Sequence, residues 1–161
     1  MQDKLNQAIT YRNEEKFDEA EKLFLELVAE YPDSAEVEYH FAWLCDKRGM
    51  ETAAVPHYER AIALGLAGDD LRGALLGLGS TYRTIGEYPQ AVATLQRGME
   101  TFPESQEFPT FLAMALYNTG EYKQAVSLLL KTLVAASDDE RIQRFSRAIL
   151  FYADELDTVW R

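Results

Sequence analysis

The sequence predicts an all-α solenoid in which four helical hairpins follow one another and a further helix covers the last. The first observation is a repeat, because alanines followed by apolar residues at helical spacing recur at intervals of 34, 37 and 34 residues, at Ala20, Ala54, Ala91 and Ala125. The second observation is that a small residue stands twelve positions before each of these alanines, at Ala8, Ala42, Gly79 and Ala113. A period of about 34 residues is typical of stacked two-helix units. Two facing small side chains also let the helix axes of one hairpin approach closely.

The bend between the two helices is marked by glycine in three of the four copies. Gly49, Gly86 and Gly120 each stand five residues before the repeated alanine, and glycine most easily adopts the left-handed backbone that ends a helix. An aromatic residue follows the bend at Phe17, Tyr88 and Tyr122, whereas the second copy has Glu51. We expect these rings to pack against the bend from the core side.

The ends of the second helices set the repeat boundaries. Pro32 and Pro103 stop two of these helices, Gly65 and Gly68 end another, and Ser137 ends the last. The predicted hairpins therefore occupy residues 1–34, 35–70, 71–105 and 106–137 of a single domain.

Both ends of the chain have features that finish a solenoid. Lys4 and Gln7 make the outer side of the first helix polar, as expected where no earlier repeat covers it. The run 137–140, SDDE, has the pattern of a capping box and predicts a capping helix over 138–157. Its apolar stripe, which we expect to cover the last hairpin, consists of Ile142, Phe145, Ile149, Tyr152 and Leu156. Leu150 and Phe151 lie outside this stripe, where they rest against the hairpin edge, pack beside a groove of the solenoid or form a small dimer contact.

Composition and charge argue against several classes of partner. The 161 residues include 27 acids and 16 bases, so the net charge of −11 repels phosphate backbones and anionic lipid headgroups. We therefore predict binding to neither nucleic acid nor membranes. A single cysteine, Cys45, favours a reducing compartment, and we predict the cytoplasm. The N-terminus does not resemble a signal peptide, and the apolar run 126–136 is too short to span a bilayer.

Residues that carry catalysis or bind metals are few. His40 and His57 fall on different helices, and no pair of histidines or cysteines has the spacing of a metal site. Cys45 occupies an inward position and is interpreted as a small buried apolar residue. The run 77–79, GLG, lacks the third glycine and the preceding strand of a dinucleotide fingerprint. We predict a protein that is not an enzyme, with no metal site and no cofactor.

The small residues at the crossing, the glycine and aromatic residue at the bend, and the terminal proline together resemble the tetratricopeptide repeat over residues 1–137. The length and the run 71–82, LRGALLGLGSTY, are similar to a small bacterial family of stand-alone four-repeat proteins. The resemblance implies a right-handed solenoid whose first helices line a concave groove, where extended peptides or partner helices lie.

The resemblance therefore implies a partner-binding groove lined by residues of the first helices. They are Arg12, Tyr39, His40, Trp43, Gly73, Gly77, Arg83, Phe111, Met114 and Tyr117. The aromatic residues and Met114 are the expected apolar anchors, and the two arginines are expected to pair with acids. Some co-chaperones of the family hold C-terminal carboxylates through a ring of lysine, asparagine and arginine. This ring is missing here, since its places fall on Leu5, Ile9, His40, Gly73 and Gly77.

Two glycines on one face of the first helix of the third hairpin require an explanation. Gly73 and Gly77 are four residues apart, so they share a helix face, and each costs about 1 kcal/mol relative to alanine. Either a ligand approaches this backbone, or a neighbouring helix packs tightly there, or Trp43 leans over the gap.

The predicted function is a protein–protein interaction scaffold that binds a peptide or helix of a partner in this groove. Two alternatives remain open at this stage. One is a chaperone for a secreted or assembling client, which small size and acidic charge would suit. The other is a sensor of a small molecule or peptide signal, with its pocket over Gly73 and Gly77.

Overall fold

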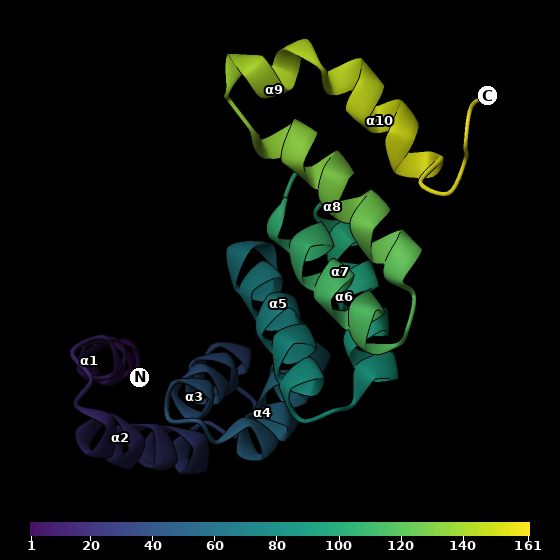
Figure 1. Cartoon of the computed structure of the whole chain (residues 1–161). Coiled ribbons are helices and arrows are strands. Elements are labelled where there is room, and N and C mark those ends of the chain that lie inside the picture. The colour runs from purple at the N-terminus through teal and green to yellow at the C-terminus, as the bar shows by residue number, and fades with distance from the viewer. The chain divides into compact units, whose positions relative to one another are not determined.

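The computed structural model describes the chain from Met1 to Arg161 and is helical without a single strand (Figure 1). The prediction of an all-α fold is confirmed. The helices are α1 Gln2–Asn13, α2 Phe17–Glu30, α3 Ala35–Lys47, α4 Glu51–Ala63, α5 Gly68–Thr84, α6 Tyr88–Thr101, α7 Glu107–Asn118, α8 Tyr122–Ala136, α9 Glu140–Arg144 and α10 Ser146–Asp154. They form two compact units, Met1–Glu87 and Tyr88–Arg161, which are described in turn. None of these helices is both long and apolar enough to cross a bilayer.

The first unit contains two helical hairpins and a fifth helix. α1 packs on α2, α3 packs on α4, and α5 lies against α3 and α4 (Figure 1). The rings of Phe24 in α2 and Phe41 in α3 stack with their centroids 5.9 Å apart, so they join the two hairpins. Burying a side chain of this size stabilises the fold by about 1.5–3 kcal/mol. One continuous apolar core therefore extends from Leu5 in α1 to Leu78 in α5.

The small residues predicted at the helix crossings are all buried. This holds for both members of each pair in the hairpins α1–α2, α3–α4 and α7–α8, and for the equivalent residues of α5 and α6. Because a larger side chain at these positions would push two helices apart, the repeat of small residues follows from close packing.

The four bends share one backbone geometry. Gly49, Gly86 and Gly120 have φ angles of 68°, 87° and 88°, as the sequence predicted. The first copy has no glycine there, and Glu15 adopts a φ of 59° at the equivalent position. In every copy the next N–H donates to a carbonyl five residues earlier, for example from Lys16 to the Tyr11 oxygen at 2.9 Å. This bond satisfies an otherwise free carbonyl at the helix end.

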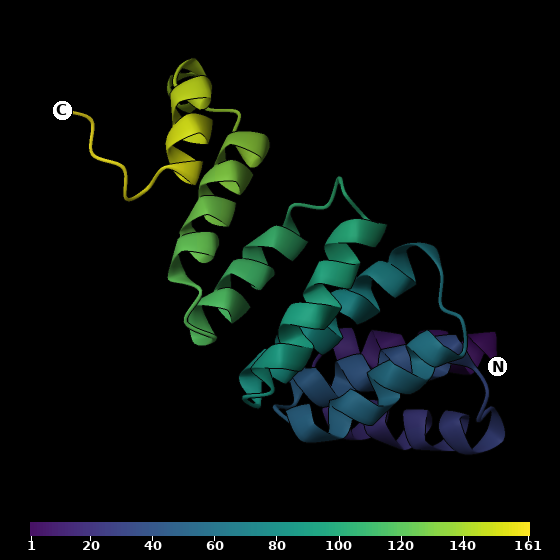
Figure 2. The same cartoon turned by 90° about the vertical axis from the view of Figure 1, so that its right-hand side faces the viewer.

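The second unit is built around α7 and α8. α6 packs on α7, α7 packs on α8, and α10 runs along α8 in both views (Figures 1 and 2). Phe108 in α7 is fully buried and lies so close to Gly98 in α6 that a Cβ there would overlap its ring. The absence of a side chain at Gly98 therefore lets α6 and α7 approach.

The C-terminal segment differs from the predicted single helix over 138–157. It forms two helices, α9 and α10, which meet at Phe145, where φ is −104° and ψ is 8°. Asp139 is the N-cap of α9 and accepts a hydrogen bond from the N–H of Arg141 at 2.8 Å, so Asp139 takes the capping role expected of Ser137.

The buried side of this segment also differs from the predicted stripe. Ile142 and Ile149 are partly covered and Ala153 is buried, whereas Phe145, Tyr152 and Leu156 are exposed. The prediction was wrong for these three residues, because α10 lies on α8 through the small side chain of Ala153 and turns its aromatic residues outward.

Candidate functional site

Four predicted groove residues of the first unit come together at the C-terminal end of α1 and along α3. We call Arg12, Tyr39, His40 and Trp43 the Trp43 cluster. The guanidinium carbon of Arg12 lies 3.9 Å from the centroid of the Trp43 ring, and one of its nitrogens, Nη1, is 3.2 Å from Nδ1 of His40. Nε and Nη2 of Arg12 donate to Oδ1 of Asn13 at 3.3 and 3.2 Å. All the donor nitrogens of Arg12 thus have partners within the chain.

The charge of Arg12 is buried without an acid beside it. Only 1% of Arg12 is exposed, and its hydrogen-bond partners are an amide and an imidazole. Burial lowers the pKa of Arg12 from its ordinary value. A buried charge is usually paired with an opposite one, so this guanidinium can still pair with an anion.

The electrostatics of the cluster keep His40 neutral. Burial, together with the charge of Arg12, lowers the pKa of His40 to about 4. A guanidinium can only donate hydrogen bonds, so Nδ1 of the neutral ring accepts from Arg12. The hydrogen bond therefore selects the tautomer with its proton on Nε2.

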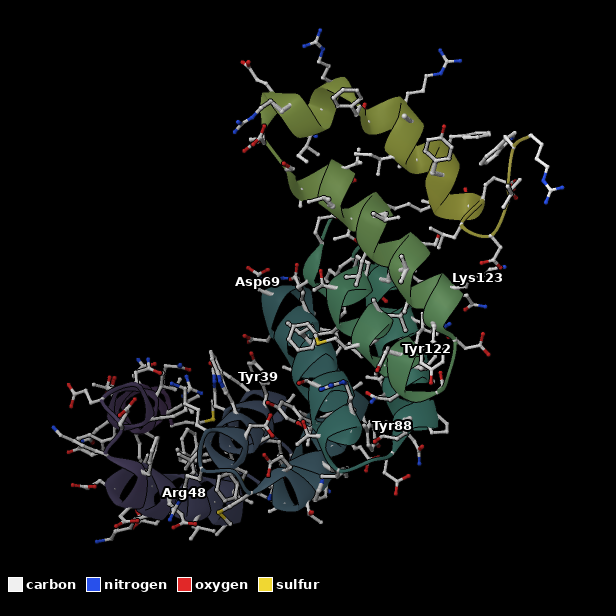
Figure 3. The ribbon with its side chains drawn as sticks, viewed as in Figure 1. Tyr39, Arg48, Asp69, Tyr88, Tyr122 and Lys123 are labelled. Atoms are coloured by element: carbon white, nitrogen blue, oxygen red, sulfur yellow. The ribbon has the colours of Figure 1, made fainter.

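Three rings of α3 lie against one another. The ring centroids of Tyr39 and His40 are 4.8 Å apart, and those of His40 and Trp43 are 6.3 Å apart. Tyr39 is labelled on α3 in Figure 3 and is buried, whereas 37% of Trp43 is exposed. Trp43 is thus the accessible member of a cluster whose other rings and guanidinium hold it in place.

Gly73 and Gly77 are explained by tyrosines of neighbouring helices. A Cβ on residue 77 would lie 2.5 Å from Oη of Tyr58 in α4, and a Cβ on residue 73 would overlap the hydroxyl of Tyr39 in α3. The structure therefore favours the packing alternative over the approach of a ligand. The pocket expected over these glycines for a small-molecule sensor is occupied by the tyrosine side chains.

Four further residues predicted for the groove lie on α5 and α7. Arg83, at the end of α5, is half-buried, and its Nε has no hydrogen-bond partner. In the second unit, Phe111 and Met114 are half-buried on α7. Tyr117 is exposed and packs edge-on against Tyr122, with the ring centroids 5.1 Å apart. As groove residues, these four stay predictions.

Beneath the first unit's surface lies a polar network that sequence reasoning missed. Tyr58 donates a hydrogen bond to one carboxylate oxygen of Asp46 at 2.8 Å, and Thr81 donates to the other at 2.8 Å. Burial raises the pKa of Asp46, although both hydroxyls favour its charged form. Asp46 stands 34 residues after Arg12, so the different residue type at this repeat position was the available signal.

The buried carboxylate of Glu38 also escaped prediction. It lies 2.6 Å from Nδ1 of His57 and 3.1 Å from Nε of Arg60. His57 is half-buried, and its ring also packs on Phe41 with the centroids 4.6 Å apart. These contacts tie α3 to α4 and have a structural role.

The chain offers no obvious reactive centre. No group of three or more histidine, cysteine, aspartate or glutamate side chains is arranged to hold a metal ion. Cys45 is buried, and burial raises the pKa of its thiol to about 11. The thiolate is the reactive form of cysteine, so this side chain is inert near neutral pH. Its interpretation as a buried apolar residue is confirmed.

The repeats, the crossing residues and the bends together define a helical-repeat protein of the kind that binds other proteins. The sequence profile described as "Tetratrico peptide repeat" matches residues 35–156, and the profile described as "Tetratricopeptide repeat" matches residues 4–34. The chain belongs to the tetratricopeptide repeat family, whose members are generally protein-interaction scaffolds. Among curated protein sequences, no significant match was found.

Solved structures of the same fold are distant in sequence. YrrB, described as a tetratricopeptide repeat protein with an unusual peptide-binding site, has a TM-score of 0.74 and 16% identity, over 87% of this chain and 71% of its own. MamA has a TM-score of 0.75 and 17% identity, over 96% of this chain and 88% of its own. Cut9–Hcn1 of the APC/C has a TM-score of 0.75 and 14% identity, over 91% of this chain and 29% of its own. These similarities establish the fold.

Proposed function

We propose that this chain is a non-catalytic scaffold that binds a peptide or helix of a partner protein on the face formed by the first helices of its hairpins. In the first unit the Trp43 cluster is the anchor site. The observation that carries the proposal is the exposed indole of Trp43, which rests on the buried guanidinium of Arg12 at 3.9 Å. A partly exposed tryptophan held in one orientation contributes large contact area at a small cost in conformational entropy.

The uncompensated charge of Arg12 supports a partner that carries a carboxylate. The guanidinium lies behind Trp43, so a modest movement of the indole would let an acidic group of the partner reach it. Charge-assisted hydrogen bonds are about twice as strong as neutral ones. Arg83, whose Nε lacks a partner, is the second proposed cation of the first unit.

In the second unit, Phe111, Met114 and Tyr117 are the proposed contact residues of α7. Tyr117 is the most accessible of the three. The description of YrrB as having a peptide-binding site adds support for a peptide ligand. Cys45, as the single and buried cysteine, supports a cytoplasmic site of action.

The test uses Trp43 as both probe and target. The chain has two tryptophans, so the Trp160→Phe variant leaves Trp43 as its sole indole fluorophore. Peptides selected from a random library on the immobilised full chain are titrated into this variant. We expect the emission of Trp43 to shift on binding, and Trp43→Ala to weaken the affinity by about 30-fold or more, as at an interface hot spot.

The matched control is Leu25→Ala, which removes an exposed apolar side chain outside both proposed sites and should leave the affinity unchanged. Circular dichroism verifies that both alanine variants are folded. Selected peptides that bind Trp43→Ala as tightly as the wild-type chain would refute the proposed anchor site.

A further inference from the structure

The outward face of α9 and α10 is unusually rich in exposed aromatic and arginine side chains. Arg144, Phe145, Arg147, Ala148, Phe151 and Tyr152 line a surface hollow of about 460 Å³. We call these six residues the arginine–aromatic face. The exposed fractions of Phe145, Phe151 and Tyr152 are 61%, 55% and 52%. Exposed aromatic side chains in one contiguous patch indicate an interaction surface, since burying them in a partner removes apolar area from water.

The aromatic side chains of this face are ordered by one another. The ring centroids of Phe151, Tyr152 and Trp160 are 5.4 to 5.7 Å apart in all three pairs. The last turn of α10 and the residues after it are fastened to α8, because Lys131 pairs with Asp154 at 2.6 Å and Lys123, labelled in Figure 3, pairs with Asp157. The face is therefore a supported surface that needs little ordering when a partner binds.

The charge of the face is opposite to that of the chain. Residues 141–153 contain three arginines and no acid, in a protein with a net charge of −11. The side chains of Arg144 and Arg147 are exposed and form no ion pair within the chain. Arginines beside aromatic residues are the composition that protein interfaces favour, and lysine is depleted there. The complementary surface is one that combines apolar side chains with carboxylates.

The same charge argues against a symmetric pair of copies through this face. A two-fold axis would bring the arginines of both copies together, and the face has no acid to offset them. The strongly acidic remainder of the chain also repels phosphate backbones and anionic headgroups. A partner helix carries only a few carboxylates, and these can lie beside Arg144 and Arg147 instead of facing the acidic remainder of the chain.

We infer that the arginine–aromatic face binds an acidic amphipathic helix of a partner protein. Arg147, Ala148, Phe151 and Tyr152 share one face of α10 at steps of three and four residues, so the hollow lies along α10, and Arg144 and Phe145 border it where α9 ends. The apolar stripe of a second helix fills such a hollow. Carboxylates that flank this stripe then pair with Arg144 and Arg147. This site is separate from the Trp43 cluster in residues and in charge pattern.

The experiment uses a designed helical peptide with leucines at steps of three and four and with glutamates on both sides of the stripe. Its comparison peptide carries glutamine in place of every glutamate. Binding of each labelled peptide to the full chain is measured by fluorescence anisotropy. We expect the acidic peptide to bind about tenfold more tightly than its glutamine counterpart, and Arg144→Glu/Arg147→Glu to remove that difference. Phe151→Ala should weaken the binding of both peptides.

The matched control is Lys22→Glu/Arg97→Glu, which changes the net charge equally at two exposed positions outside the face. This control and Trp43→Ala should both bind the acidic peptide as the wild-type chain does. If both double variants lost the same affinity for the acidic peptide, the effect would come from net charge and the inference would be overturned. If Trp43→Ala lost affinity for this peptide, the binding site would lie in the first unit and the inference would also fail.

Two further outcomes would also overturn the inference. One is a dimer in light scattering that Arg144→Glu/Arg147→Glu dissociates, which would make a second copy the occupant. The other is that the wild-type chain binds phosphatidylserine vesicles but not the acidic peptide, and that Arg144→Glu/Arg147→Glu loses the vesicle binding. That result would make the face a membrane contact.

Discussion

The phenol oxygen of Tyr58 lies 2.5 Å from the point that a Cβ on residue 77 would occupy. The same phenol donates a hydrogen bond to Asp46 at 2.8 Å, so it is held from both sides. Tyr39 stands in a similar relation to Gly73, but no hydrogen bond fixes its hydroxyl. Two glycines that look equivalent in the sequence thus contact tyrosines that differ in how far their hydroxyls can move.

Alanine substitutions separate these two cases. Gly77→Ala should destabilise the chain by about 1–3 kcal/mol, because Tyr58 cannot retreat without losing its bond to Asp46. Gly73→Ala should cost less, because the free end of Tyr39 can shift and alanine gains about 1 kcal/mol of helix propensity. Urea unfolding followed by circular dichroism measures both variants. Equal losses of stability would show that the hydrogen bond to Asp46 does not hold Tyr58 in place.

The carboxylate of Asp46 is expected to stabilise the first unit through its two hydroxyl donors. Asp46→Ala should lower the free energy of unfolding by about 2–3 kcal/mol, since it leaves the buried hydroxyls of Tyr58 and Thr81 without an acceptor. Asp46→Asn should cost less, because the amide keeps one acceptor and both hydroxyls can rotate. These values are obtained from urea denaturation at pH 7.

A pH series on Asp46→Asn tests the raised pKa of Asp46. Since the folded-state pKa lies above the unfolded value of 3.8, the stability that this group contributes is present below 3.8 and is lost as pH rises through the folded pKa. The wild-type chain should therefore lose stability relative to Asp46→Asn over that rise. A constant difference between the two curves would argue that Asp46 has an ordinary pKa.

The repeat, the bends and the buried crossings were accessible from the sequence because each depends on local spacing. Glycines at Gly49, Gly86 and Gly120 mark a backbone conformation that side chains disfavour, whatever packs around them. The reason for Gly77 was not accessible in this way. It depends on which side chain of α4 leans toward α5, and that choice is made by three-dimensional packing.

The C-terminal segment shows a second limit of spacing arguments. The sequence steps 142, 145, 149 and 152 and the steps 142, 146, 149 and 153 both fit one face of a helix. The first set is more apolar, yet in the second set Ala153 is buried and the other three residues are half-buried, because close contact with α8 requires the small side chain of Ala153 and the helix breaks at Phe145. Similarly, the sequence did not indicate that Arg12 would be buried with no acidic side chain beside it.

His40 should make stability depend on pH in the acidic range. Its folded-state pKa of about 4 lies below the unfolded value of 6.5, so the unfolded chain takes up the proton first. Stability is therefore lost as pH falls from about 6.5 toward 4, by as much as about 3 kcal/mol. His40→Gln should lose less over this range, which unfolding curves at several pH values detect. An NMR titration of His40 with a midpoint near 6.5 would contradict this prediction.

The first bend has glutamate, Glu15, in a left-handed backbone conformation. It adopts a φ of 59° where the other three copies have glycine, and a left-handed conformation costs a residue with a side chain about 1–2 kcal/mol. Glycine would relieve this strain, but it also raises the entropy of the unfolded chain, which offsets part of the stabilisation. Glu15→Gly should therefore stabilise the first hairpin by about 0.5–1 kcal/mol, visible as a higher midpoint of urea unfolding.

The control for Glu15→Gly is Glu15→Ala, which removes the same charge but keeps the strained backbone. Glu15→Ala should leave stability close to that of the wild-type chain. The nearby ion pair between Glu14 and Lys16, at 2.7 Å, does not involve Glu15 and is kept in both variants. If the alanine variant were stabilised as much as the glycine variant, the gain would come from removing a negative charge in an acidic hairpin. A gain confined to glycine would establish that the first bend tolerates glutamate only at an energetic cost, which the other three copies avoid.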